Sequence, residues 1–292
     1  MILATREGRT TGAEGMELAW RLWEVEASRA SVLIVHGLGE HSGRYRSVAE
    51  VLSDSGISVF AFDLRGHGLS EGPRGDVSAF PRFLEDLLVM EEVLDRELPG
   101  SFPRFLLGHS LGGLIALERL RTLGEGYAGA ILSAPWIRAA QSRWLRTLGR
   151  RIGWLFPRAP MPNGIGPGRL TRDPVVAEAW KRDPLIHTRL TGGLFREAER
   201  VQRELLKGGI STRIPTLFLI PGSDQVVDGR VTEEFARGIV EGAVRVEILE
   251  GRFHEPFNDL GREEVLETVA TWLRGLLTAE RVDSRREDDP LT

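Results

Sequence analysis

Cysteine is absent from this chain of 292 residues. The protein therefore forms no disulfide, has no thiolate metal site and has no cysteine nucleophile. Residues 1–11 lack the basic region and apolar core of a signal peptide. No run of about 18 uncharged apolar residues occurs, so we expect no membrane-spanning helix. These absences together favour a cytoplasmic protein.

An excess of positive charge is also missing. Lysine and arginine number 38 against 42 for aspartate and glutamate, which leaves a net charge of −4. This balance gives no reason to expect a nucleic-acid partner. The contents of 41% hydrophobic and 27% charged residues are ordinary for a globular protein. A chain of this length can bury a large core, as one domain or as a domain with an inserted subdomain.

Strand patterns alternate with helical patterns along the first half of the chain. Continuous apolar runs predict strands buried on both faces, at 31–35, 57–62, 105–107 and 128–132. The intervening segments have the spacing of amphipathic helices. An imperfect alternation over 17–26 predicts an edge strand. This order is typical of an α/β fold with a mostly parallel sheet flanked by helices.

The alternation stops between residues 136 and 209, where proline and glycine gather at 157–168. It then resumes with strand and helix patterns, at 214–220, 231–240, 244–249 and 263–277. We therefore predict a core of residues 1–135 and 210–279, with a helical cap at 136–209. Such an insertion lies over the crevice where parallel sheets bind ligands. The charged tail at 280–292 is predicted to be disordered.

One glycine-rich motif has the context of a nucleophile elbow. Residues 108–112 read Gly-His-Ser-Leu-Gly, between a strand pattern and a helical pattern. The glycines are needed because this turn is strained and neighbouring backbone comes close. The motif also occurs at 68–72, but Pro73 follows it, so no helix can begin where an elbow needs one. We predict Ser110 as the nucleophile.

A serine hydroxyl requires a base and an orienting carboxylate. In α/β-hydrolases the acid and then the histidine follow the serine in the chain. Only His187, inside the insertion, and His254, just past the last strand pattern, follow Ser110. We predict His254 as the base because its loop can reach the same edge of the sheet as Ser110.

Two aspartates follow the strand pattern at 214–220. Asp224 is nearer the strand end, and Gly222 permits a tight turn that would aim its side chain inward. Asp228, followed by Gly229, is expected to cap the next helix. We favour Asp224 as the acid and keep Asp228 as the alternative.

An oxyanion hole needs two backbone N–H groups aimed at the developing negative charge. One is expected from Leu111, directly after the nucleophile, and the other from the loop at 36–39. Leu38 is our choice there, since Gly37 lets this loop approach closely. His36 is expected to brace the loop by hydrogen bonding.

Five motifs in order resemble the monoacylglycerol lipase and lysophospholipase family of α/β-hydrolases. They lie at residues 36–45, 63–72, 108–113, 222–228 and 253–255. The resemblance extends over about residues 17–278. It implies an α/β-hydrolase fold and hydrolysis of single-chain acyl esters through an acyl-enzyme. It also implies that no cofactor takes part.

The insertion has its own chemical character. It contains four of the seven tryptophans, Trp136, Trp144, Trp154 and Trp180. Between 141 and 156, apolar residues recur at helical spacing among four arginines, Arg143, Arg146, Arg150 and Arg151. A basic amphipathic segment can lie on an anionic membrane, which predicts peripheral membrane contact. The alternative is a cap helix that packs on the core and leaves its arginines in solvent.

Several other functions remain open on the same core. They are a general carboxylesterase, a lysophospholipase, a serine peptidase, an acyltransferase, or a binding protein without activity. The basic and apolar start of the insertion favours lipid-like esters over a peptidase substrate. A serine at the elbow argues against dehalogenase and epoxide-hydrolase chemistry, which use an aspartate there. The expected partner is a small acyl ester; neither a metal nor a cofactor is expected.

Overall fold

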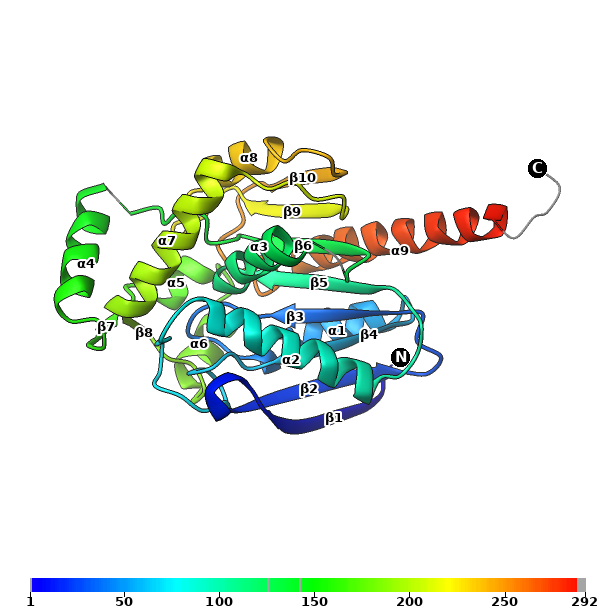
Figure 1. Cartoon of the computed structure of the whole chain (residues 1–292), viewed down its shortest axis with the longest axis horizontal. Helices are drawn as coiled ribbons and strands as arrows, with labels where there is room; N and C mark the ends of the chain where they lie inside the picture. The colour runs from blue at the N-terminus through cyan, green and yellow to red at the C-terminus, as the bar shows by residue number, and fades with distance from the viewer. Residues whose placement is uncertain (1, 125, 142, 288–292) are drawn as a thin grey trace.

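The computed structural model of the protein describes residues 2–124, 126–141 and 143–287 (Figure 1). An eight-stranded sheet has the strand order β1-β2-β4-β3-β5-β6-β9-β10. Its strands are β1 Ile2–Thr11, β2 Glu17–Val25, β3 Ala30–Val35, β4 Ile57–Phe62, β5 Arg104–His109, β6 Gly129–Ser133, β9 Thr216–Pro221 and β10 Val244–Leu249. Only β1 and β2 pair antiparallel with their neighbours. The predicted α/β fold with a mostly parallel sheet is therefore confirmed.

Helices cover both faces of the sheet (Figure 1). They are α1 Arg46–Ser53, α2 Pro81–Glu97, α3 Leu111–Leu123, α7 Gly192–Gly208, α8 Gly229–Arg237 and α9 Arg262–Glu287. One core cluster lies under α2, α3, α7 and α8, and a second under α1 and α9. In β3, Leu33 and Val35 join the first cluster while Val32 and Ile34 join the second. This two-sided burial explains why the central strands read as continuous apolar runs.

The edge of the sheet differs from the prediction. The strand predicted at 17–26 exists as β2, but β1 pairs along it from Thr11 opposite Glu17 to Ile2 opposite Val25. The short turn η1, Ala13–Gly15, joins the two strands. The described side chains of edge strand β1 are all partly or fully exposed, so the strand lacks the apolar periodicity that reveals a buried strand.

The segment between β6 and β9 forms the insertion. It contains α4 Arg143–Leu155, β7 Pro160–Pro162, α5 Pro167–Leu170, α6 Pro174–Arg182 and β8 Arg189–Thr191, and then α7. These elements gather beyond the carboxyl ends of the parallel strands (Figure 1). Strands β7 and β8 pair antiparallel within the segment predicted to be helical, because each is too short to show a pattern in the sequence. Helix α7 buries Leu194, Ala198 and Val201 in the cluster that α2 and α3 share.

The last helix is longer than predicted. Helix α9 continues past Leu277 to Glu287, so residues 280–287 are helical where a disordered tail was expected. No glycine or proline interrupts 276–289, and most of the residues are good helix formers. Residues 288–292 lie outside the described part of the chain. No helix among the described residues is both long and apolar enough to cross a membrane.

Candidate active site

Ser110 occupies the strained turn between β5 and α3. Its backbone has φ 51° and ψ −112°, in a region that residues other than glycine rarely adopt. Two backbone hydrogen bonds hold it there: its N–H donates to Ser133 at 3.0 Å, and its carbonyl accepts from Trp136 at 2.9 Å. The largely buried side chain lines two cavities at the carboxyl edge of the sheet, where an elbow places its nucleophile.

The flanking glycines are needed for close approach. A Cβ atom on Gly108 would lie 2.5 Å from the carbonyl oxygen of Gly112. A Cβ atom on Gly112 would overlap the backbone carbonyl of Val35 at the end of β3. Both neighbours are backbone atoms, so no side-chain rotation can make room. The sequence reasoning that tied these glycines to crowding therefore has a direct structural basis.

The structure brings Ser110, His254 and Asp224 together. Ser110 Oγ and His254 Nε2 are 3.0 Å apart, and His254 Nδ1 lies 2.8 Å from Asp224 Oδ2. The other oxygen of Asp224 accepts hydrogen bonds from the backbone N–H groups of Val226 and Val227 at 2.7 and 3.0 Å. This arrangement can move the serine proton to the histidine while the aspartate fixes the ring.

The electrostatics of the pair suit that transfer. Burial opposes the ionisation of Asp224, but His254 and the two N–H donors outweigh burial and lower the pKa of Asp224 below its usual value. Burial likewise opposes a charge on His254, yet the Asp224 carboxylate outweighs burial and raises the pKa of His254 above 6.5. In contrast, burial lowers the pKa of the adjacent His109 to about 4. His109 thus stays neutral where His254 changes its charge.

The two predicted oxyanion donors are placed close to Ser110, one by the chain and one by the cavities. Leu111 is the first residue of α3, where backbone N–H groups have no partner within the helix. Leu38 lines two cavities together with Ser110. The loop of Leu38 is braced as predicted: His36 Nδ1 donates to the Gly37 carbonyl at 2.8 Å, and His36 Nε2 accepts from the Leu64 N–H at 2.9 Å.

A buried charge network beside the triad was not predicted. Arg44 donates to Glu40 at 2.9 Å and to both oxygens of Glu255 at 2.7 and 2.5 Å. Glu40 also accepts from the Gly37 N–H at 2.6 Å. Burial would raise the pKa of Glu40, but Arg44 and neighbouring histidines lower it to about 2. The network joins the loop after β3 to the loop after β10. Only the i,i+4 spacing of Glu40 and Arg44 hints at it in the sequence.

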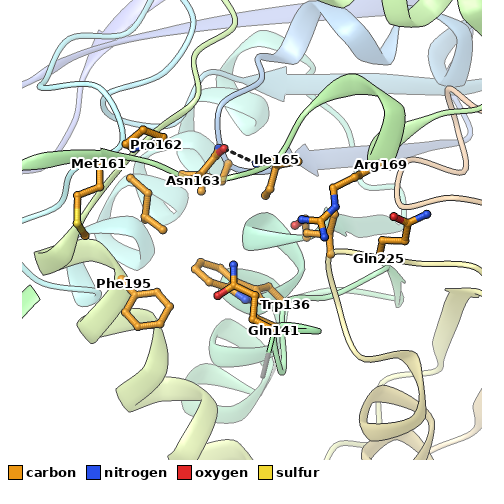
Figure 2. Close-up of a pocket in the computed structure, with 14 residues that line it drawn as sticks. Trp136, Gln141, Met161, Pro162, Asn163, Ile165, Arg169, Phe195 and Gln225 are labelled. Carbon is orange, nitrogen blue, oxygen red and sulfur yellow. Dashed lines mark hydrogen bonds between the residues drawn. The ribbon is translucent and has the colours of Figure 1, made fainter. Parts of the chain in front are cut away.

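The larger of the two cavities that Ser110 lines, called the main cavity below, has a volume of about 170 Å³. Fourteen residues line it (Figure 2). Its buried wall includes Trp136 and Phe195, whereas Gln141, Arg169 and Gln225 lie at its exposed side. A second cavity of about 30 Å³ touches Ser110 from the side of His254, Glu40 and Glu255. The insertion thus provides walls for both cavities.

Three other candidate residues have structural partners. Ser70, in the second Gly-x-Ser-x-Gly match, donates from its Oγ to the Asp63 carbonyl at 2.6 Å within a loop. Asp228 caps α8 by accepting from the Val231 N–H, as the sequence predicted. His187 lines the second cavity and lies 3.2 Å from the Gly66 carbonyl through Nε2. Among the described residues, no group of three or more histidine and carboxylate side chains could hold a metal ion.

Comparison with known proteins gives consistent relatives. A family model described as serine aminopeptidase, S33 (Hydrolase_4) matches residues 26–261. A monoacylglycerol lipase of Mycolicibacterium smegmatis is 29% identical over 94% of this chain and 99% of its own. Human monoglyceride lipase is 32% identical over 83% of this chain and 86% of its own.

Larger proteins and solved structures also match. An uncharacterized abhydrolase domain-containing protein of Dictyostelium discoideum is 28% identical over 94% of this chain, which spans 29% of that protein's length. The crystal structure of the monoacylglycerol lipase of Paleococcus ferrophilus superposes with a TM-score of 0.78. It is 28% identical and covers 90% of this chain and 98% of its own.

Proposed function

Because the chain belongs to the Hydrolase_4 family of serine hydrolases, we propose that it is a carboxylic ester hydrolase that releases a fatty acid from monoacylglycerol-like esters. One observation carries this proposal. Ser110, His254 and Asp224 form a continuous hydrogen-bonded chain at the end of a largely apolar cavity. The relatives named monoacylglycerol lipase or monoglyceride lipase support the substrate class.

The reaction proceeds in two halves. Ser110 Oγ attacks the ester carbonyl while His254 Nε2 takes the serine proton, and the N–H groups of Leu38 and Leu111 bind the resulting oxyanion. Asp224 holds the imidazole ring in place and stabilises its charged form. His254 then gives the proton to the departing alcohol, which leaves an acyl-enzyme. Water deprotonated by His254 attacks this ester, and the fatty acid is released.

The two cavities support an orientation of the substrate, with its alcohol oxygen in one cavity and its acyl chain in the other. His254 must protonate the alcohol oxygen, and His254 lines the smaller cavity. With a volume of about 30 Å³, it is the smaller of the two cavities. That space suits the leaving oxygen and later the attacking water. The larger cavity, with Trp136 and Phe195 in its wall, suits the acyl chain.

An aminopeptidase is the second candidate, because the family description names that activity. Such an enzyme must hold the protonated amine of its substrate, which favours an unpaired carboxylate near the nucleophile. No carboxylate lines the main cavity among the described residues. In the smaller cavity, Glu40 and Glu255 are both paired with Arg44. These pairings favour a neutral ester over a free amino terminus.

We also propose that residues 136–209 act as a cap that brings the site to lipid surfaces. Four large apolar side chains at α4 and just after it are mostly exposed: Trp144, Trp154, Leu155 and Phe156. Arg150 and Arg151 are exposed beside them. Contiguous exposed apolar residues with arginine neighbours are typical of peripheral membrane contact. The side chains of Arg143 and Arg146, predicted to take part, lie outside the described part.

Hydrolysis of a substrate panel tests the proposed function. The panel pairs monoacylglycerols and p-nitrophenyl esters of increasing chain length with aminoacyl p-nitroanilides. We expect ester turnover that rises with chain length by up to about fourfold for each methylene buried, until the cavity is full. Ser110→Ala should abolish this turnover without loss of fold. Turnover of the anilides alone would favour the aminopeptidase, and ester turnover retained in Ser110→Ala would refute the assignment.

A further inference from the structure

Arg169 is the single charged residue among the fourteen that line the main cavity. It belongs to the short helix α5 in the insertion. Figure 2 shows its side chain reaching toward the cavity between Ile165 and Gln225. The cavity that holds Ser110 therefore has a positive charge at its exposed side and, in the described chain, no carboxylate to balance it.

The backbone next to Arg169 is anchored to the core. The carbonyl of Leu170 accepts a hydrogen bond from the Glu255 N–H at 2.9 Å. The hydroxyl of Thr171 donates to the Asn258 carbonyl at 2.8 Å. Both acceptor and donor belong to the loop that carries the predicted catalytic base. Arg169 is thus held at a fixed place relative to the catalytic groups, as a recognition residue must be.

The guanidinium of Arg169 is largely free to bind a ligand. Its one side-chain hydrogen bond in the described structure is a long one, 3.3 Å, to the carbonyl of Gly164. The neighbouring Arg172, by comparison, is paired with the buried carboxylate of Asp259 at 2.9 Å. No ion pair joins Arg169 to a carboxylate within the described residues. A guanidinium has five donors in a fork that matches a carboxylate or a phosphate.

Two uncharged amides complete the exposed side of the cavity. Gln141 and Gln225 line it with Arg169 and are exposed, so their NH₂ groups can donate to an anion. Trp136 and Phe195 give the same cavity an apolar wall, and Gln141 lies close to Trp136 (Figure 2). The cavity therefore combines an apolar lining with a donor-rich part at its exposed side, which has net positive charge.

We propose that this donor-rich part binds an anionic group of the substrate, so that the enzyme prefers acyl esters that carry a phosphate or a carboxylate over neutral esters of the same length. Arg169 binds the anion, and Gln141 and Gln225 donate further hydrogen bonds. The inference rests on the proposed ester hydrolysis, which supplies the reaction; the new element is the charge of the preferred substrate.

Two parts of an ester could supply the anion. A phosphate on the glycerol would belong to the alcohol, and the smaller cavity beside His254 presents the carboxylates of Glu40 and Glu255 rather than a free cation. It would then have to reach the main cavity. A carboxylate at the far end of the acyl chain would instead pass along the apolar wall to Arg169. Both sources require the same positively charged end of the cavity.

Two matched pairs of substrates separate these sources. The first pair is monodecanoylglycerol and decanoyl lysophosphatidic acid. The second is p-nitrophenyl octanoate and the p-nitrophenyl monoester of octanedioic acid. All are assayed below their critical micelle concentrations. In at least one pair we expect kcat/KM for the anionic member to exceed that of the neutral member by about tenfold or more, mainly through KM. The pair that responds identifies the source.

Arg169→Gln should bring the ratio of kcat/KM for the anionic member to kcat/KM for the neutral member near one. Arg169→Lys should keep part of the preference for the anionic member. Arg182→Gln is the matched control, because Arg182 is an exposed arginine in the next helix, α6, and does not line the cavity. It should leave the ratio unchanged. A preference for the neutral member in both pairs, or a ratio that Arg169→Gln does not change, would overturn the inference.

Failure of the proposed function gives a different result. If no ester in either pair is hydrolysed, the proposed ester hydrolysis is wrong, and calorimetric titration with decyl phosphate and with octanedioate then tests the anion site directly. Binding of either anion that weakens about tenfold or more in Arg169→Gln supports the site. Equal binding by the two proteins, or none by the wild type, excludes it.

Discussion

The guanidinium of Arg44 donates two hydrogen bonds to the carboxylate of Glu255, at 2.7 and 2.5 Å, across 211 positions of sequence. Glu255 directly follows His254, and Arg44 also holds Glu40 beside the predicted oxyanion loop. One buried cation thus connects the loop of the base with the loop of the oxyanion donor.

We predict that Arg44→Gln destabilises the fold by about 3–5 kcal/mol, because two buried carboxylates lose their counter-ion. It should also lower kcat, since both loops are then free to shift. Urea denaturation and ester turnover measure the two effects. Arg46→Gln is the control, as Arg46 is exposed and pairs with Glu50 at the surface. Equal losses of stability in the two variants would contradict a special role for Arg44.

The lowered pKa of Glu40 makes a prediction for acid stability. Its pKa falls from 4.5 in the unfolded chain to about 2 in the fold, chiefly because Arg44 outweighs the effect of burial. Ionised Glu40 therefore stabilises the fold above pH 4.5. This contribution to stability is lost as the pH falls through about 2. The free energy of unfolding should decline less steeply over this range in Glu40→Gln than in the wild type. Parallel curves would show that Glu40 does not contribute.

The Asp224–His254 pair predicts the pH profile of catalysis. His254 must be neutral to accept the serine proton, and its pKa lies above 6.5 because Asp224 outweighs burial. Activity should therefore fall as the pH drops through a value above 6.5. In Asp224→Asn we expect turnover to fall by roughly 10³–10⁴-fold and the acid limb to move to lower pH, since only the weaker effects of Glu255 and Glu40 then oppose burial.

Asp228→Asn separates the two aspartates that the sequence offered. Asp228 caps α8, and asparagine caps a helix about as well. This variant should keep the wild-type rate and the wild-type acid limb when kcat/KM is measured against pH. A large loss in Asp228→Asn together with a small one in Asp224→Asn would reverse the assignment of the acid.

Replacing glycine by alanine should change stability in opposite directions at two positions, Gly112 in the elbow and Gly275 in α9. In Gly112→Ala the new Cβ meets the backbone of Val35, so we expect a loss of about 1–3 kcal/mol in the free energy of unfolding, together with loss of activity. In Gly275→Ala, within α9, the Cβ meets no atom within 4 Å. That variant should gain about 0.5–1 kcal/mol. Thermal or urea unfolding distinguishes the signs.

Exposed aromatic residues at the cap predict membrane binding. Trp154 and Phe156 are 71% and 60% exposed, and burying either side chain in lipid stabilises by about 1.5–3 kcal/mol. Replacement of both by alanine should weaken binding to phosphatidylglycerol vesicles by tenfold or more, as measured by sedimentation. Leu123→Ser, which alters an exposed leucine at the far end of α3, should bind like the wild type. If the aromatic variant binds equally well, the cap does not dock on lipid.

The sequence predicted the parts of the fold that burial makes visible. Strands β3 and β4 are buried on both faces, and their apolar runs located them within a residue. Strand β1 escaped prediction because exposed side chains impose no apolar period. Strands β7 and β8 have three residues each, which is too short for any pattern to emerge.

The site shows the same division. The meeting of Ser110, Asp224 and His254 was predictable because each lies in the segment after a strand, and parallel strands bring their ends to one edge of the sheet. The pairing of Arg44 with Glu255 could not be predicted, because no local sequence pattern shows which buried charged residues will meet. Arg169 was missed for a related reason: its place in the cavity depends on how an irregular insertion folds back over the sheet.

The pairing of β6 with β9 has an evolutionary consequence. These neighbours are in register from Ala130 opposite Thr216 to Ser133 opposite Leu219, although the insertion separates them in the chain. Lengthening, shortening or replacing residues 141–190 therefore need not alter a hydrogen bond described for the eight-stranded sheet. Selection can remodel the walls that meet the substrate while the bond-breaking groups stay in place. Proteins that descend from one ancestor can in this way act on different substrates by the same reaction.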